Sequence, residues 1–503
     1  MRYCQLRNSY PFLAGLLALF VTLGCEHPPE PDDGAEVSTG LDWVPCDESE
    51  PWYLDGVECS PLAVPVDWSE SDGPELELRL ARLPAASAEA RVGVVLVLSG
   101  GPGGSGLDDL PAVAEGLPEV RRYFDLVAHE PRTARTLRDR PRECVQVPDV
   151  VLDVPESEEE YAEMLRPIAE GIEACREADE SGIIDHLDGW AQARDVDAIR
   201  AALGEERINL TAQSYGAVVV TAYAREFPHR IRAAFVDGAV QSHPDGWEGG
   251  LDATTAADAR FGQFADWCEA EPECPLYGED VRALWLALTE GANEAPIPAT
   301  TTSGEETWAS GAHLHFHTRG AIAPGEEGWS QLAADIDRAR NGDAGPFAEW
   351  AHGNLAQWSM PLTIAMQCSD GLTGPPGYEA FLERMERRRE IAPLSYGRGL
   401  LGLPCGAWAT PVANPPAPLP GDQLPPFLGT GTSWDDFPGT ELLLSHIPGS
   451  VAVPVEGPGH IVYLPGPAGP ANPCVLEHLS RYLIELELPG TDARCDPVQP
   501  PPG

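Results

Sequence analysis

The stretch INLTAQSYGAVVVTAYAREFP, residues 208–228, decides the fold of this chain. Its first residues form a short β-prone run, Ser214 stands in a turn, and residues 217–224 have the Ala, Val and Tyr content of a helix. Small residues at Ala212 and Gly216 flank the serine, as a sharp strand-to-helix turn requires. Such a turn lifts a serine hydroxyl toward a base, so Ser214 is the candidate nucleophile. Alone, this pattern of small residues around a serine more often marks an ordinary turn. Two further motifs favour a catalytic serine.

An apolar run of strand length, VGVVLVL at 92–98, ends in the glycine-rich loop SGGPGGSG at 99–106. Its composition predicts a strand buried on both faces. A loop of this kind exposes backbone N–H groups, which hold the developing oxyanion in acyl transfer. We predict an oxyanion hole made by Gly100, Gly101 and the N–H of Tyr215. The alternative is a phosphate-binding loop, but that motif needs a lysine, and the chain contains none.

A candidate base and acid follow late in the chain. His460 ends EGPGH (456–460), after the predicted strand SVAVPV (450–455). Hydrolases of this architecture carry an acid between the serine and the histidine, and GTSWDDFP offers Asp435 and Asp436. The carboxylate would fix the imidazole tautomer, and the histidine would take the serine proton and return it to the leaving group. A lone histidine is usually structural and paired aspartates are usually solvated, but this order and spacing favour a catalytic triad.

With these motifs the chain resembles the prolyl iminopeptidase and tripeptidyl aminopeptidase group of α/β-hydrolases, especially its secreted bacterial branch. The resemblance extends over nearly the whole mature chain. It is also carried by CSPLAVPVDW (59–68), FPHRIRAAFVDGAV (227–240), AMQCSDG (365–371), PCGAW (404–408) and LPGTDARC (488–495). It implies an α/β-hydrolase fold with a mostly parallel sheet flanked by helices, and an inserted, mainly helical cap. It also implies serine-dependent cleavage of peptides near a free N-terminus, without a cofactor.

The family pattern leaves the acid open between neighbouring residues. When the family pattern is aligned forward from Pro426, the acid position falls on Asp435, which we predict as the acid. When the pattern is aligned backward from Pro438, the same position falls on Trp434. Asp436 is the second candidate. The segment HEPRTART lacks the glycines of the corresponding family turn. Two other functions therefore stay open: an esterase with the same triad, and a non-catalytic binding lipoprotein with the same fold.

The order of segments predicts the domain organisation. Residues 246–400 hold helix-like stretches rich in Ala, Glu, Arg and Trp, which indicates the cap. The predicted parts are a signal peptide (1–24), an acidic Pro-rich tether (25–42), the first part of the core (43–245), the cap (246–400), the C-terminal part of the core (401–495) and a disordered tail (496–503).

The N-terminus has the features of a bacterial export signal. Arg2 and Arg7 precede an apolar run at 11–24. Cys25 follows in VTLGC, which resembles a lipobox, and we predict it as the lipidation site; a soluble secreted protein is the alternative. Since no later apolar run reaches the roughly 18 residues of a transmembrane helix, membrane attachment is predicted only through this anchor.

The cysteine count agrees with export. The chain has 12 cysteines, and ten remain when Cys4 and Cys25 are set aside. An even number in an oxidising compartment favours disulfides, and no C-x-x-C cluster suggests a metal site. The resemblance and the proximity of the residues imply the pairs Cys46–Cys59, Cys144–Cys175, Cys268–Cys274, Cys368–Cys405 and Cys474–Cys495.

The net charge of the chain excludes some classes of binding partner. The formal net charge is −48, with 80 acidic residues against 32 basic ones, all of them arginine. Such a balance argues against binding to nucleic acid and against electrostatic docking on anionic lipid. A peptide substrate is the partner that we predict.

Overall fold

The computed structural model describes residues 40–498 except 71, 241–242, 244–245, 323–324, 373–376 and 467–468. The predicted signal peptide, the lipidation site Cys25 and nearly all of the predicted tether lie outside the described residues, as do the last five residues of the tail. The predictions made for these segments are not addressed by the structure.

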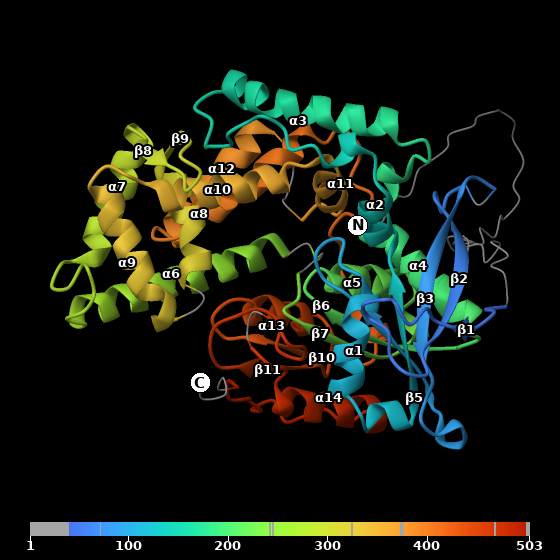
Figure 1. Ribbon diagram of the computed structural model, residues 1–503. Coiled ribbons are helices and arrows are strands. Elements are labelled where there is room, and N and C mark those ends of the chain that lie inside the picture. Colours follow the sequence, from blue (N-terminus) through green and yellow to red (C-terminus); the bar gives the residue numbers. More distant parts are fainter. Residues whose placement is uncertain are drawn as a thin grey trace, which may run out of the picture. The chain divides into compact units, whose positions relative to one another are not determined.

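A nine-stranded sheet with the order β1-β2-β3-β5-β4-β6-β7-β10-β11 forms the core (Figure 1). Its strands are β1 (Val44–Pro45), β2 (Glu58–Pro65), β3 (Glu75–Leu83), β4 (Gly93–Leu98), β5 (Phe124–Glu130), β6 (Ile208–Gln213), β7 (Ile231–Asp237), β10 (Leu428–Thr432) and β11 (Val451–Val455). The pairs from β5 to β11 are parallel, and β1, β2 and β3 are antiparallel additions. The green strand β7 thus lies beside the orange-red β10 in Figure 1, although about 190 residues of chain separate them.

Seven α-helices lie outside the predicted cap within the described residues. They are α1 (Gly106–Gly116), α2 (Arg132–Asp139), α3 (Glu158–Ala178), α4 (Gly189–Ala202), α5 (Gly216–Glu226), α13 (Phe437–Ser445) and α14 (Pro473–Glu485). Short 3-10 turns lie at Ala88–Ala90, Val120–Arg122, Arg142–Val145, Ile183–His186, Pro228–Arg230 and Gly421–Gln423.

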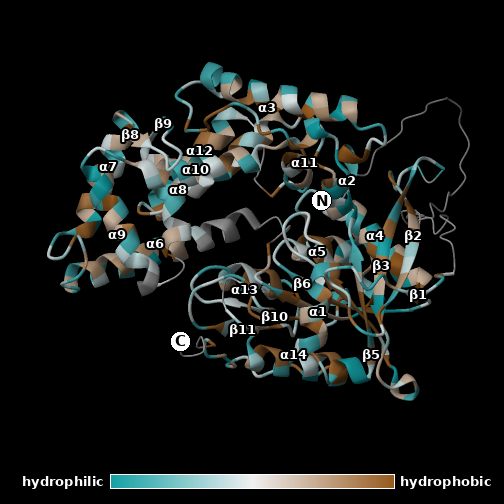
Figure 2. Cartoon of the chain, in the orientation of Figure 1, coloured by the Kyte–Doolittle hydropathy of each residue, from teal (hydrophilic) through white to brown (hydrophobic). Residues whose placement is uncertain are grey.

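The central strands are buried on both faces, as the sequence predicts for β4. All six residues of β4 are buried, and Figure 2 shows the strands in the middle of the sheet in brown. Alternate residues of β4 belong to two hydrophobic cores: Leu96 lies in the core shared with α4 and α5, and Val97 lies in the core shared with α1 and α14. Helices therefore cover both faces, which is the layered arrangement of an α/β fold.

The parallel strands bring several loops to one edge of the sheet. Because β4, β6, β7, β10 and β11 run in the same direction, the loops that follow them all start at their carboxyl ends. In open α/β sheets ligands bind at this edge. The predicted oxyanion loop, nucleophile, acid and base all lie in these loops.

Residues 246–407 are mostly helical. They form α6 (Gly246–Ala270), α7 (Val281–Glu294), β8 (Ile297–Thr300), β9 (Glu306–Ala309), α8 (Gly311–Ile322), α9 (Glu326–Arg340), α10 (Gly345–Trp358), α11 (Pro361–Ser369), α12 (Tyr378–Ile391) and the 3-10 helix η6 (Tyr396–Ala407). The antiparallel pair of β8 and β9 was not expected from the sequence. Phe261, Trp285 and Phe347 belong to a hydrophobic core made only by this part of the chain.

The unusual turn HEPRTART is built around a buried ion pair. Arg132 is fully buried, and its guanidinium donates to both carboxylate oxygens of Asp195 at 2.7 Å. It also donates to the carbonyl oxygens of Pro65, Val66 and His186. A buried arginine needs this number of acceptors, because an unpaired buried charge is strongly destabilising. Arg132 therefore anchors this segment to α4 and to the end of β2, and nothing in the structure explains the loss of the glycines.

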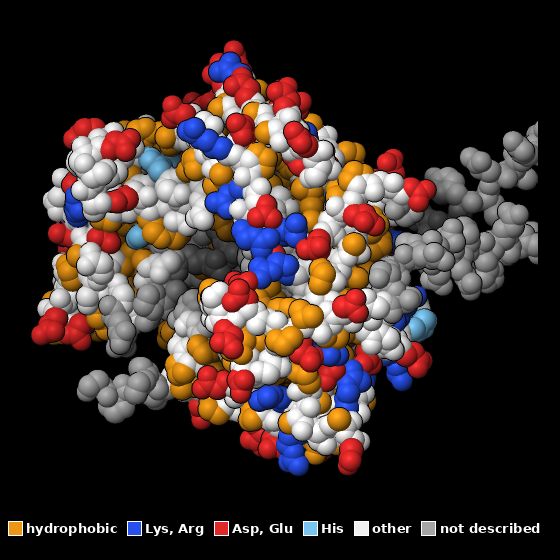
Figure 3. Space-filling view, turned by 45° about the vertical axis from the view of Figure 1, so that its right-hand side comes forward, with side chains coloured by type: hydrophobic (Ala, Val, Ile, Leu, Met, Phe, Trp, Pro, Cys, Tyr) orange, Lys and Arg blue, Asp and Glu red, His pale blue; other side chains and the backbone are white. Residues whose placement is uncertain are grey.

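All five predicted disulfides are confirmed, at Cys46–Cys59, Cys144–Cys175, Cys268–Cys274, Cys368–Cys405 and Cys474–Cys495. Figure 3 shows carboxylate side chains scattered over the face in view and fewer arginines, in line with the net charge of −48. Among the helices of the described residues, none has the length and apolarity needed to cross a bilayer.

Candidate active site

Ser214 stands in a strained turn between β6 and α5. Its φ angle of +49° lies in the left-handed region, which residues other than glycine rarely adopt. The Ser214 N–H donates to the carbonyl of Asp237 at 2.8 Å, and a Cβ added to Gly216 would lie 2.8 Å from the carbonyl oxygen of Ser99. Glycine is therefore required at 216, whereas Ala212 fits within β6, fully buried. Such strain in a turn is common at functional sites.

The oxyanion loop, residues 99–105, passes directly beside the serine side chain. A Cβ added to Gly100 would lie 2.9 Å from Ser214 Cβ and 3.6 Å from Ser214 Oγ. Within the part of the chain that the structure describes, the N–H groups of Gly100, Gly101 and Tyr215 have no hydrogen-bond acceptor. The three donors that the sequence predicts are thus free to bind a substrate oxygen.

Replacing Gly100 with alanine should lower kcat/KM by about 10- to 100-fold, because the new Cβ must displace the Ser214 side chain or the loop. Gly353→Ala is a matched control, since a Cβ added to this glycine of α10 meets no atom within 4 Å. Steady-state kinetics of both variants measures the effect. Equal activity of the two variants would mean that this close approach is irrelevant to turnover.

His460 pairs with Asp436, not with Asp435 as the sequence predicts. His460 Nδ1 lies 2.5 Å from Asp436 Oδ2, and the Asp436 side chain is only 8% exposed. Asp436 Oδ1 accepts the backbone N–H of Thr432 at 2.6 Å. The geometry of the turn after β10 explains why Asp436, and not Asp435, reaches the histidine. The turn after β10 is closed by a bond from the Asp435 N–H to the Thr432 carbonyl, and the carboxylate that reaches the histidine comes one residue later.

Gly238 brings the serine turn and the Asp436–His460 pair together. It follows Asp237, whose carbonyl binds the Ser214 N–H. A Cβ added to Gly238, which has a φ of +60°, would lie 2.5 Å from Asp436 Oδ2 and 3.0 Å from His460 Cε1. No hydrogen bond joins Ser214 Oγ to His460 among the described residues. Catalytic hydrogen bonds are often long without substrate and tighten when it binds.

The surroundings of His460 favour its charged form. Burial alone would lower the pKa of His460, but the hydrogen bond and charge of Asp436 outweigh it, with smaller contributions from Asp435 and Asp237, so the pKa is raised. A base with a raised pKa accepts the serine proton more readily. The imidazolium that forms is then stabilised by the carboxylates around it.

Two buried networks that the sequence analysis missed support the nucleophile turn. The Tyr215 hydroxyl donates to Asp370 Oδ2 at 2.5 Å and lies 3.0 Å from the Met366 carbonyl oxygen. Gln213 Nε2 donates to Asp109 Oδ2 at 2.8 Å. Burial raises the pKa of Asp370 to about 7, with the charge of Asp188 as the next cause. These partners lie more than 100 residues from the turn, so a local motif could not reveal them.

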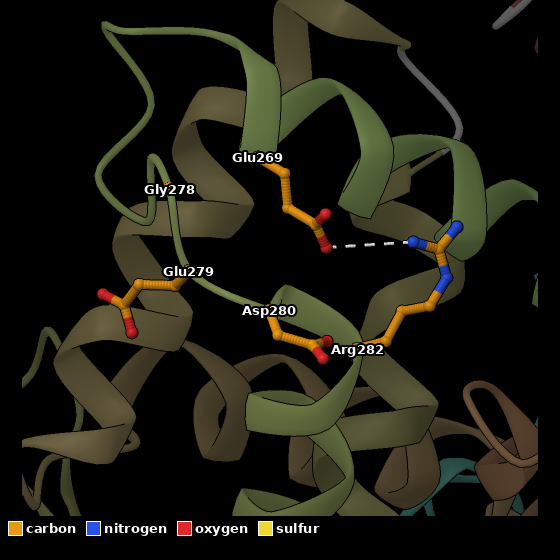
Figure 4. Close-up of a pocket in the computed structure, with 5 residues that line it drawn as sticks. All are labelled: Glu269, Gly278, Glu279, Asp280 and Arg282. Carbon is orange, nitrogen blue, oxygen red and sulfur yellow. Dashed lines mark ion pairs between the residues drawn. The ribbon is translucent and has the colours of Figure 1, made fainter.

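A hollow of about 490 Å³ elsewhere in the structure is lined by Glu269, Gly278, Glu279, Asp280 and Arg282 (Figure 4). Its charged groups already have structural partners. Asp280 caps α7, Glu269 accepts the Val281 N–H, and Glu279 pairs with Arg340. Figure 4 also shows the ion pair between Arg282 and Glu269, 3.9 Å apart. The hollow contains none of the predicted catalytic residues.

Two groups of residues of metal-binding type stand out in the part of the chain that the structure describes. Cys474, His478 and Cys495 lie close together, but the two sulfur atoms form a disulfide. The histidines of HLHFH (313–317) are buried in or beside α8, and His313 Nε2 lies 2.7 Å from the Leu152 carbonyl oxygen. Neither group lies in the loops around Ser214.

The comparisons with known proteins agree with this geometry. Residues 93–294 match the family model for the alpha/beta hydrolase fold. The serine protease Hip1 of Mycobacterium tuberculosis is 27% identical over 492 residues, covering 90% of this chain and 91% of that protein. The tripeptidyl aminopeptidase of Streptomyces lividans is 27% identical over 483 residues, covering 92% and 88%. Carboxylesterase B of Mycobacterium tuberculosis is 26% identical over 465 residues, covering 87% and 86%. It follows that this chain has the α/β-hydrolase fold, and that its predicted resemblance to the prolyl iminopeptidase and tripeptidyl aminopeptidase group is confirmed.

Proposed function

We propose that this chain is an exported serine hydrolase that cleaves peptides from a free N-terminus through a triad of Ser214, His460 and Asp436. The observation that carries the proposal is the partly buried Asp436–His460 pair, whose close approach to the turn of a strained serine is allowed by the missing side chain of Gly238. A serine in such a turn, beside a base oriented by a carboxylate, is the arrangement used for acyl transfer.

The proposed reaction has two halves. Ser214 Oγ attacks the carbonyl carbon while His460 Nε2 takes the hydroxyl proton, and Asp436 holds the opposite nitrogen of the imidazole. The N–H groups of Gly100, Gly101 and Tyr215 bind the oxyanion of the tetrahedral intermediate. His460 then gives the proton to the leaving amine, and water hydrolyses the acyl-enzyme by the same route.

Peptides are the favoured substrates because two of the similar proteins are named a serine protease and a tripeptidyl aminopeptidase. An esterase with the same triad is the second candidate, and the similarity to carboxylesterase B supports it. Export is supported by the five disulfides, since these bonds persist mainly in oxidising compartments. Attachment through an acyl chain on Cys25 belongs to the same proposal and is tested by labelling the expressed protein with palmitate, beside Cys25→Ala.

A panel of fluorogenic substrates separates these activities. It contains Pro-, Ala- and tripeptidyl-amides, the same amides with a blocked N-terminus, and short acyl esters. We expect cleavage of the free amides and at least tenfold slower cleavage of the blocked ones, because recognition of the substrate ammonium contributes a charge-assisted hydrogen bond. Cleavage of esters alone would move the assignment to an esterase, and no turnover at all would favour the non-catalytic binding protein.

A further inference from the structure

Asp237, the last residue of β7, connects the nucleophile turn to the loop that carries the base. Its carbonyl accepts the Ser214 N–H at 2.8 Å. Its carboxylate oxygen Oδ2 accepts the N–H groups of Val462 and Tyr463, at 2.7 and 2.8 Å. These two residues come directly after His460 and Ile461, so Asp237 fixes the backbone that positions the imidazole.

The carboxylate of Asp237 is deeply buried and incompletely bonded. Asp237 is 0% exposed, and its Oδ1 has no hydrogen-bond partner among the residues that the structure describes. The titratable groups that face it are Asp436, from the turn before α13, and His460 and Tyr463, from the base loop. Burial, and next the charge of Asp436, raises the pKa of Asp237 to about 7.

Within the described part of the chain, Asp237 accepts two backbone N–H groups on one carboxylate oxygen and none on the other. We infer that its negative charge, and not only its hydrogen bonds, has a role. Two backbone N–H bonds would be satisfied equally well by a neutral amide oxygen, at no cost of burying a charge. The charge of Asp237 acts on His460, where a positive charge develops during the reaction, and opposite charges interact strongly in a buried site.

We propose that Asp237 is a positioning residue that holds the base loop and supplies His460 with a second carboxylate beside Asp436. The inference rests on the proposed function, because it assigns His460 the role of base. The two carboxyls come from different parts of the fold, because Asp237 ends β7 and Asp436 lies in the turn between β10 and α13. The imidazolium is therefore stabilised from two sides once Asp237 has lost its proton.

The substitution Asp237→Asn separates the charge from the hydrogen bonds, since the asparagine oxygen still accepts both N–H groups. Labelling of Ser214 by a fluorophosphonate is measured against pH, because this reaction needs the base but no particular substrate. For Asp237→Asn we expect labelling about tenfold slower at pH 8, with the acid limb of the profile moved to lower pH, because loss of a negative neighbour lowers the pKa of His460. Asp237→Ala, which also loses the acceptor, should label about 100-fold more slowly.

Asp125→Asn is the matched control. Asp125 is also buried and also accepts a backbone N–H, from Ala85 at 2.8 Å, and its other oxygen pairs with Arg91 at 2.9 Å. It lies near the start of β5, at the opposite end of the strands. The rate of fluorophosphonate labelling of Asp125→Asn should depend on pH as it does in the wild type. A profile of Asp237→Asn that equals the wild-type profile in both rate and pH dependence would overturn the proposal.

A second measurement depends neither on turnover nor on a substitution of Asp237. In Ser214→Ala protein, the NMR titration of His460 should show two inflections, one from the protonation of the imidazole and one from the protonation of the buried Asp237 beside it. A titration of His460 with a single inflection would also overturn the role of Asp237. Absence of any Ser214-dependent labelling in the wild type, by contrast, would contradict the proposed function itself and leave this titration as the test of Asp237.

Discussion

Replacing Ser214 with alanine is expected to lower kcat/KM by about 10⁵-fold on any substrate that the wild type cleaves. The loss is this large because the acyl-enzyme cannot form without the hydroxyl, and the remaining groups act only by binding the oxyanion. Steady-state kinetics on the best substrate of the panel measures the ratio, and mass spectrometry after fluorophosphonate treatment shows whether the label is attached to Ser214.

The control for this variant is Ser445→Ala. Ser445 is exposed on α13 and its hydroxyl only donates to the Leu442 carbonyl of the same helix, so its removal should leave the kinetics unchanged. Thermal unfolding of both variants should stay close to that of the wild type, since neither change opens a cavity in the core. Residual activity of Ser214→Ala within tenfold of the wild type would remove Ser214 from the mechanism and favour a different nucleophile.

The main features of the fold are readable in the sequence because each has a local signature. The run at 92–98 is apolar at nearly every position, and its short length and high valine content indicate a strand covered on both faces. The serine turn is marked by small residues around Ser214, which the close approach to Ser99 requires. The disulfide pairs came from a resemblance, since cysteine spacing alone does not fix connectivity.

The parts that sequence reasoning missed depend on tertiary contacts. Asp435 and Asp436 are adjacent and chemically equal, and the choice between them depends on where β10 ends and how the following turn closes. Asp237 looks like an ordinary residue at the end of a strand, and its partner Val462 lies 225 residues away. The four-residue strands β8 and β9 are too short to show a periodic pattern.

Exchanging Asp436 for asparagine should lower kcat by about 10⁴-fold, whereas Asp435→Asn should stay within about threefold of the wild type. An asparagine at 436 still accepts the Thr432 N–H through its oxygen, but its amide group then faces His460 Nδ1 and favours the wrong tautomer. The fold is kept while the base is disabled, so thermal unfolding of the two variants should differ little. Measuring kcat of Asp436→Asn and of Asp435→Asn over a range of pH tests this prediction.

The neighbouring aspartate is a strict control, because it carries the same charge one residue away. Asp435 contributes only its charge to the raised pKa of His460, so Asp435→Asn should move the acid limb slightly to lower pH without a large loss of rate. The opposite result, a severe loss in Asp435→Asn and a mild one in Asp436→Asn, would restore the assignment made from the family pattern. If Asp436→Asn retains more than about 1% of the wild-type rate and loses it on adding Asp237→Asn, the two carboxyls are coupled through the imidazole. The base would then be oriented by a pair of acids, and a single missing carboxylate would not abolish its function.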